Sequence, residues 1–341
     1  MTHALRMLTG SQAMDFLAGS WRELYRLDPA ATPFQSSEWL SAWAEQLPAT
    51  MRPVVLASVG ATGRPLAALA LARHDDGADT RIVPLSAPYA ECIRPVGPFA
   101  DDPEVAASFV FHLMLLTEEG GQDISMTDVL ATSGLGRYLR QISQADGWNR
   151  VDTKYATVRL PFVYAALSRP TRREHLRRQR SWDRAAANHR VTYARTHHPQ
   201  ALLDAHAVMA GLRPARWYDD LLSERAPTGR PEHWRSVLRR LDPTTTFIAT
   251  LAIDDTVVAA RLCLTRGRHC YSLVPVTDTA HRSLAPDHAL LRHLIGDLTR
   301  KGFTALHLGR TPAPEQGGAG QYQPEWTSTL SVLTEPRCAL A

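Results

Sequence analysis

Arginine side chains are concentrated in one short stretch near the middle of the sequence. The segment Ser168–Arg190 contains eight arginines and only two acids, Glu174 and Asp183. A guanidinium presents its N–H donors in a planar fork that matches phosphate oxygens, so such a cluster can bind a polyphosphate or a nucleic-acid backbone. The alternative is a solvated charged face, or a strap between two domains, whose arginines pair with acids. The residue types leave both interpretations open.

The same stretch has the composition of a helix. Pro170 falls in the expected first turn and good helix formers follow it. Leu176 and Trp182 are the only large apolar side chains, so we expect the helix to bury a thin stripe. The candidate phosphate-binding residues on it are Arg172, Arg173, Arg177, Arg178 and Arg180.

Patterns of other enzyme classes are missing from the sequence. There is no G-x-S-x-G nucleophile motif, no Walker motif and no dinucleotide-binding fingerprint. The four cysteines are scattered without a CxxC pair, which predicts neither a zinc site nor a disulfide framework and favours a reducing cytoplasm. His197 and His198 are adjacent, and adjacent residues of a strand point to opposite faces, so we expect no metal site there.

Length and composition are those of a globular protein. A chain of 341 residues predicts two domains of about 150 residues each. Hydrophobic residues make up 44% and charged residues 21%, which excludes wholesale disorder. No apolar run approaches the roughly 20 residues of a membrane span, and no signal peptide is evident at the start. We therefore expect a cytoplasmic protein without a membrane partner.

Hydrophobic spacing predicts a similar order of elements in each half. Expected in the first half are a helix over Asp15–Leu27, a helix capped by Ser36 or Ser37, and a hairpin that joins Pro53–Val59 to Pro65–Ala72. Expected in the second half are a hairpin (Thr246–Ile253 and Val257–Leu264), a strand (His269–Val276), a helix (Pro286–Lys301), a strand (Ala305–Leu308) and a last strand (Thr327–Leu333). The prediction is an α/β (α+β) fold of two lobes, 1–167 and 191–341, linked by a basic helix at 168–190. Each lobe is expected to hold a mixed, mostly antiparallel sheet flanked by helices.

Several segments, taken in order, resemble a known superfamily. They are Phe34–Leu40 with Trp43, Arg172–Arg180, Leu212–Trp217, Phe247–Ala260, Arg282–Pro286 and Gly302–Gly309. This order resembles the GNAT acyltransferases, and more narrowly the tandem-GNAT branch that contains the CelD-like proteins and the Fem aminoacyl transferases. The resemblance covers almost the whole chain and implies two GNAT-like lobes, the second of which holds the donor cleft.

The resemblance also implies site residues around the strand Tyr271–Val276. Tyr271 would protonate a leaving group, and Asp278 or His281 would act as base at the mouth of the cleft. Gln323 would donate a hydrogen bond to the oxyanion, and Glu325 would face the acceptor. Each has a structural alternative, since Tyr271 suits a sheet face and the others suit exposed loops, while His307 suits a hydrogen-bonded core position.

Two departures from the superfamily affect the donor. The turn His281–Asp287 lacks the glycines of the usual pyrophosphate loop, although Arg282 and Ser283 remain candidates for phosphate binding. Gln323 stands where Fem-like relatives often have a lysine.

The resulting prediction is an amide-forming N-acyltransferase without a bound cofactor. The donor is expected to be an aminoacyl-tRNA, with acyl-CoA or an acyl carrier protein thioester as alternatives. The acceptor is expected to be the amine of a small molecule in specialised metabolism. A non-catalytic RNA-binding protein with the same fold is the alternative from another class.

Overall fold

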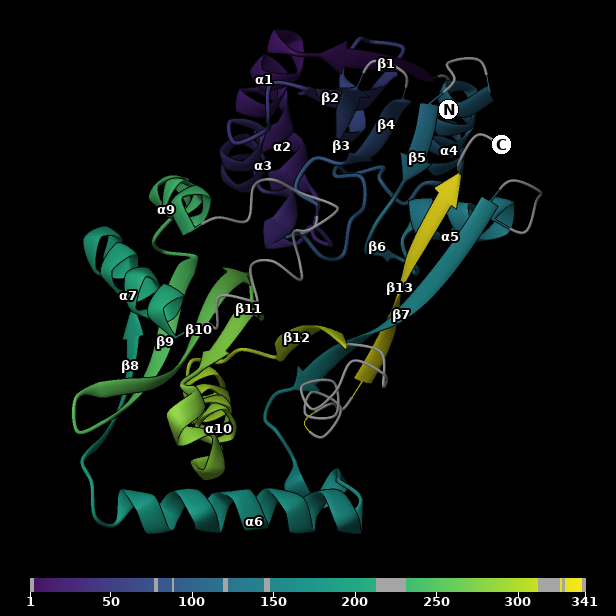
Figure 1. The fold of residues 1–341 in the computed structure, drawn as a ribbon. Helices are drawn as coiled ribbons and strands as arrows, with labels where there is room; N and C mark the ends of the chain where they lie inside the picture. Colours follow the sequence, from purple (N-terminus) through teal and green to yellow (C-terminus); the bar gives the residue numbers. More distant parts are fainter. Residues whose placement is uncertain are drawn as a thin grey trace. The chain divides into compact units, whose positions relative to one another are not determined.

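The chain folds into two compact units in a computed structural model, which describes residues 3–76, 79–87, 89–118, 122–143, 148–212, 231–311, 326 and 329–338 (Figure 1). The described part of the first unit lies within Met1–Lys154 and Ser331–Ala341, and that of the second within Tyr155–Glu224 and Gly229–Leu330. No helix in the described part is long and apolar enough to cross a membrane.

The division differs from the predicted boundaries in two places. The basic helix belongs to the second unit instead of standing between two lobes, because its buried Trp182 is part of that unit's core. The last strand belongs mainly to the first unit, because it pairs there with two shorter strands.

The first unit is a mixed sheet with helices. Its elements are β1 (His3–Thr9), α1 (Ser11–Ala18), α2 (Ser20–Leu27), α3 (Ser37–Ala44), β2 (Met51–Gly60), β3 (Pro65–Asp76), β4 (Asp79–Pro84), α4 (Pro103–Glu118), β5 (Gln122–Ser125), β6 (Val129–Leu130), α5 (Gly134–Ile142), the start of β7 (Trp148–Arg159) and most of β13 (Thr329–Cys338). The strand order is β1-β2-β3-β4-β5-β13, and β6 also pairs with β13. Only β4 and β5 are parallel neighbours in this order.

Local signals explain several of these elements. The β2–β3 hairpin is confirmed, and Gly63 in its turn has a φ of 79°, which a glycine adopts without strain. Ser36 caps α3, since its side chain accepts a hydrogen bond from the backbone N–H of Trp39 at 3.1 Å. The helix predicted over Asp15–Leu27 is two helices, separated at Gly19.

The second unit has the same general plan. Its elements are the end of β7, α6 (Arg169–Ala186), β8 (Val191–Thr196), α7 (Pro199–Gly211), α9 (Pro231–Arg240), β9 (Thr246–Ile253), β10 (Thr256–Arg266), β11 (His269–Thr277), α10 (Pro286–Arg300) and β12 (Ala305–Thr311), with the short 3-10 helices η2 (Tyr164–Ala166) and η3 (Thr279–Leu284). The order β8-β9-β10-β11 is antiparallel, and β12 adds to β11 in parallel.

Helices cover both faces of this second sheet. Most residues of β9 are buried whichever face they point to, because α10 packs against one side and α7 against the other (Figure 1). Helix α10 contributes four leucines to the core of this unit: Leu290, Leu291, Leu294 and Leu298. The two-residue turn Asp254-Asp255 has φ values of 47° and 69°, the geometry of a type I′ hairpin turn.

A buried ion pair holds the first unit together. Arg94 is 3% exposed and donates to Asp28 at 2.8 Å and to Asp101 at 2.7 Å. Asp28 is 2% exposed and also accepts from the backbone N–H groups of Ala30 and Gly97. The pair joins the segment after α2 to the segment that follows β4.

We predict that Arg94→Ala lowers the free energy of unfolding by about 3–5 kcal/mol, because the Asp28 carboxylate stays buried without its partner. Arg73→Ala is the matched control, since its ion pair with Asp75 is about one-third exposed and should contribute less than about 1 kcal/mol. Urea unfolding followed by fluorescence measures both, and equal losses in the two variants would contradict the prediction.

Candidate functional site

Strands β11 and β12 part in the middle of the second sheet. They pair at three positions, His269↔Ala305, Cys270↔Leu306 and Tyr271↔His307. Beyond Tyr271 no further pair joins the described residues of the two strands, although β11 continues to Thr277 and β12 to Thr311. The described parts of β11 and β12 therefore diverge after these three pairs, and the sheet has an opening between them.

A bulge explains why β11 turns away. The register between β10 and β11 shifts after Arg261, so that Val274 has no partner and takes a φ of 38°. An extra residue in one strand bends that strand and increases its twist. The opening is thus a consequence of local backbone geometry in β11.

The equivalent place in the first unit is closed by the chain itself. There β4 ends at Pro84, and a strand-like segment resumes at Ile93, which pairs in parallel with Val129 of β6. Val96 of the same segment exchanges two hydrogen bonds of 2.8 Å with Ala68 of β3. The parallel pairing therefore continues where the strands of the second unit part.

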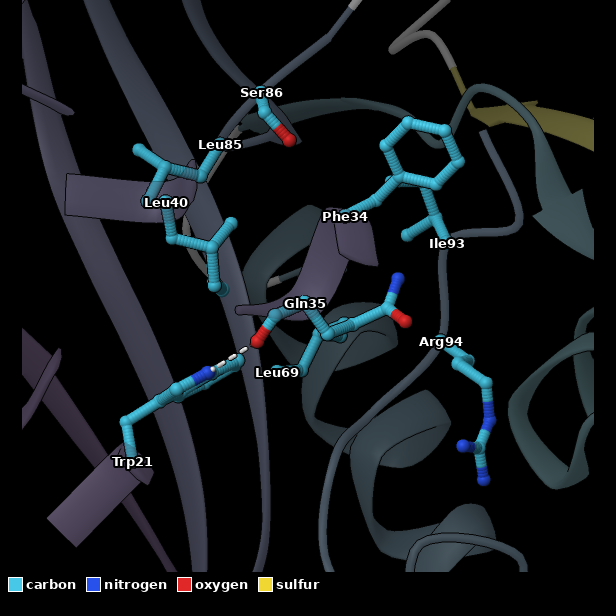
Figure 2. Close-up of a pocket in the computed structure, with 10 residues that line it drawn as sticks. Trp21, Phe34, Gln35, Leu40, Leu69, Leu85, Ser86, Ile93 and Arg94 are labelled. Carbon is cyan, nitrogen blue, oxygen red and sulfur yellow. Dashed lines mark hydrogen bonds between the residues drawn. The ribbon is translucent and has the colours of Figure 1, made fainter. Parts of the chain in front are cut away.

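Figure 2 shows the small pocket left at this interruption. Its walls are Trp21, Phe34, Gln35, Leu40, Leu69, Ala70, Leu85, Ser86, Ile93 and Arg94. A cavity of about 10 Å³ holds at most one water molecule, which the buried hydroxyl of Ser86 could bind. The space cannot take an acyl chain, so the candidate site lies in the second unit.

Tyr271 and His307 stand where β11 and β12 separate. Their rings stack with centroids 4.3 Å apart. His307 Nδ1 is 3.0 Å from the hydroxyl of Thr157, and its Nε2 is 3.1 Å from His269 Nδ1. Both ring nitrogens thus have partners, which agrees with the interpretation of His307 as a structural histidine. Burial, with a smaller effect of His269, lowers the pKa of His307 to about 3.

Asp278 and His281 form a pair directly after β11. The Asp278 carboxylate accepts hydrogen bonds from the backbone N–H of Ala280 at 3.0 Å and from His281 Nδ1 at 2.7 Å. These bonds, the first from Ala280, hold the pKa of Asp278 below its ordinary value. A charged Asp278 favours the tautomer of His281 that carries its proton on Nδ1, so Nε2 can accept a proton from an amine.

Arg261 ties the sheet to the start of α10 beside this pair. The guanidinium is 2% exposed, donates to both oxygens of Asp287 at 2.9 and 2.7 Å, and donates to the hydroxyl of Ser272 at 2.9 Å. Asp287 lies in the first turn of α10, so the bond holds that helix N-terminus against the bulged strand. Sequence analysis missed Arg261, since one arginine within an apolar strand gives no pattern.

The turn that carries Arg282 and Ser283 is the 3-10 helix η3. Its backbone N–H groups are used within the turn, for example from His281 to Asp278 and from Ala285 to Arg282. Ala285 has a left-handed φ of 52°, and Pro286 brings no N–H to the first turn of α10. The turn therefore differs from an open glycine loop whose free N–H groups surround a pyrophosphate.

The arginines predicted to bind phosphate lie on α6. Arg172, Arg173, Arg177 and Arg180 are exposed, whereas Arg178 is partly buried. Glu174 binds both Arg177 and Arg178 at 2.6–2.7 Å, and the bond from Arg177 is the main reason that its pKa falls to about 2. The hydroxyl of Ser181 reaches the carbonyl of Ser283 at 3.4 Å, which places α6 beside η3.

The buried stripe of α6 differs from the prediction. Trp182 is buried as expected, but Leu176 is 51% exposed and His175 is buried in its place. His175 lies seven residues before Trp182, on the same side of the helix, and its Nδ1 is 3.2 Å from Nε2 of His288. Helical spacing could have identified this histidine, had a histidine been allowed as a core residue.

Two predicted site residues, Gln323 and Glu325, lie outside the described residues, so their roles stay predictions. The neighbouring Trp326 is buried, and its ring lies 4.3 Å from that of His175 and 4.8 Å from that of His288. Trp326 thus packs between α6 and α10, close to the start of α10.

Comparison with known protein families identifies the domain that contains these residues. Residues 170–323 match the acetyltransferase (GNAT) domain family, a range that includes the opening, the Asp278–His281 pair and nearly all of α6. The chain carries a GNAT acetyltransferase domain. It is accordingly an acyltransferase, as the sequence predicted. No curated protein matches the chain in sequence.

Solved structures extend the GNAT likeness over both units. FemX shares 11% identity over 98% of this chain and 96% of its own, with a TM-score of 0.58. A tandem GNAT protein from the clavulanic acid biosynthesis pathway shares 12% identity over 99% of both chains, with a TM-score of 0.53. L-PGS from Bacillus licheniformis shares 12% identity over 95% of this chain and 91% of its own, with a TM-score of 0.53. At these identities the likeness concerns the fold, and the predicted tandem GNAT fold is confirmed.

The low pKa of His307 predicts a pH-dependent stability of the GNAT unit. The folded state keeps this histidine neutral down to about pH 3, whereas the unfolded chain protonates it near pH 6.5. Its contribution is therefore complete above pH 6.5 and is lost as the pH falls towards 3, by up to about 2 kcal/mol between pH 7 and 5. Urea unfolding at several pH values measures the slope, which His307→Gln should reduce; an unchanged slope in the variant would refute the assignment.

Proposed function

We propose that this GNAT protein transfers an acyl group from an activated donor to the amine of a small molecule, at the opening between β11 and β12. The parting of the strands after Tyr271 is the observation that carries the proposal. Beyond Tyr271 the described backbone of β11 no longer pairs with β12, and the strand ends at a side chain that can accept a proton. Backbone N–H groups at such an edge can stabilise the oxyanion of an acyl transfer.

The reaction follows from these groups. The amine nitrogen attacks the donor carbonyl, a C–N bond forms, and the bond from the carbonyl carbon to the oxygen or sulfur of the donor breaks. Nε2 of His281 takes the proton of the amine, while Asp278 positions the ring through Nδ1. We assign the protonation of the leaving group to Tyr271, which lies where the two strands separate. No covalent enzyme intermediate is required.

We further propose an aminoacyl-tRNA as the donor, in preference to acyl-CoA or an acyl carrier protein thioester. Two observations support this choice. The N–H groups of η3 are used within the turn, which weakens the case for the pyrophosphate of coenzyme A. The arginines of α6 lie beside the same turn, where they suit a longer phosphate backbone. The reaction would take place in the cytoplasm, and the acceptor would belong to specialised metabolism.

We predict that His281→Gln lowers kcat/KM for amide formation by about 10²–10⁴-fold, because the amine loses its base. Asp278→Asn should lower it less, since the base is kept but its tautomer is no longer fixed. His189→Gln is the matched control: His189 forms a similar pair with Asp254 at 2.6 Å, on the surface where β8 begins. Steady-state kinetics with a radiolabelled donor measures all three, and full activity of His281→Gln would exclude this base.

A donor comparison tests the choice of aminoacyl-tRNA. The purified protein is incubated with a mixture of small amines and either charged bulk tRNA or acetyl-CoA, and new amides are detected by mass spectrometry. We expect products from charged tRNA. Products from acetyl-CoA alone would replace the donor and keep the acyltransferase, whereas RNA binding without any product from either donor would favour the non-catalytic alternative.

A further inference from the structure

The arginines of α6 are arranged as a stripe along one face of the helix. Arg169, Arg173, Arg177, Arg180 and Arg184 follow one another at intervals of four, four, three and four residues, and all five are exposed. With about 100° of rotation per residue, these intervals keep the five side chains within one narrow sector. The stripe extends over about 22 Å at about 1.5 Å per residue.

The opposite face of the same helix is packed against the second unit. His175 and Trp182 are buried there, 2% and 3% exposed, and Trp182 is part of the core of the second unit. Half a turn of rotation separates this pair from the stripe, so the packing that anchors α6 also turns the arginines to solvent. The orientation is therefore set by the core of the unit.

Few of these arginines are neutralised by acids. Among the described residues Arg169, Arg173, Arg180 and Arg184 form no ion pair, while Arg177 binds Glu174. Asp183, the other acid of the helix, approaches Arg292 of α10 at 3.7 Å. Exposed ion pairs add little to stability, so these arginines are not needed for the fold. The row presents several guanidinium groups to solvent at regular spacing.

We infer that this stripe is the docking surface for the phosphodiester backbone of an RNA. The arginines recur about once per helical turn, so neighbouring forks can bind successive phosphates along one strand. The inference rests on the proposed function in one respect, that the RNA carries the acyl group. The bond from Ser181 to Ser283 brings the C-terminal half of the stripe beside η3. An RNA bound along α6 would thus have one end near Arg282 and the opening of the sheet.

This assignment changes the set of residues predicted from sequence. It adds Arg169 and Arg184, and it removes Arg178, which is partly buried and held by Glu174. Arg172 is exposed but lies outside the sector of the stripe, nearer the buried face. The angular position of each arginine around the axis of α6 therefore distinguishes the arginines proposed to bind RNA from Arg178, which packs against the rest of the unit.

The test is the salt dependence of binding to uncharged bulk tRNA, measured by fluorescence anisotropy between 50 and 200 mM salt. The triple variant Arg173→Ala, Arg180→Ala, Arg184→Ala should bind at least about tenfold more weakly at low salt and should lower the slope of log K against log salt by about 3. Alanine favours the helix, so the variant should fold, which circular dichroism verifies. The control is Arg6→Ala, Arg26→Ala, Arg52→Ala, which removes the same charge from exposed positions of the first unit and should leave binding unchanged.

The outcomes separate the stripe from the proposed donor. Equal tRNA binding by both triple variants would overturn the assignment of the stripe to RNA. The assignment would also be overturned if the stripe variant kept its tRNA binding and lost only its binding to vesicles of phosphatidylglycerol and phosphatidylcholine. Acyl transfer from charged tRNA with an unchanged KM in the stripe variant would also overturn it, while leaving the proposed function intact. Stripe-dependent tRNA binding together with transfer from acetyl-CoA alone would keep the stripe and reject the donor.

Discussion

The guanidinium of Arg261 is almost completely removed from water, and both Asp287 and Ser272 hold it there. A buried cation of this kind is tolerated only when its donors are satisfied, so β10, β11 and the first turn of α10 are fixed relative to one another. The bulge at Val274 lies in the same region and turns β11 away from β12. The opening, the Asp278–His281 pair and η3 all follow this bend, and their geometry depends on it.

The two units share an order of elements but differ where a substrate would bind. In the first unit a segment of the chain itself occupies the corresponding place, where Ile93 pairs with Val129 and Val96 pairs with Ala68. Arg94 fixes this segment through its bonds to Asp28 and Asp101. In the second unit β11 and β12 do not pair beyond Tyr271 and His307 in the described residues, and we propose that the acyl donor binds there. A sheet edge must be paired, covered or used, and each unit shows one solution.

Helix α6 combines a face that packs against the second unit with a face that we propose to bind RNA. The packing of His175 and Trp182 determines which arginines of α6 face solvent. The bond from Ser181 to Ser283 places the C-terminal half of the helix beside η3. GNAT enzymes need an activated donor more than a reactive side chain, because the energy for amide formation comes from the ester or thioester that is broken. The surface that selects the donor is therefore as informative about function as the base.

Sequence by itself determined the hairpins, the long apolar helix α10, the density of charge on α6 and, through the order of motifs, the superfamily. These features depend on neighbours within a few turns or one strand, and residue types record them directly. The tertiary structure decided the rest: that His175 is buried instead of Leu176, that Asp278 faces His281, that Arg261 is a buried anchor, and that β11 and β12 part. Each of these depends on contacts between segments distant along the chain, or on one bulged residue, and neither leaves a periodic pattern in the sequence.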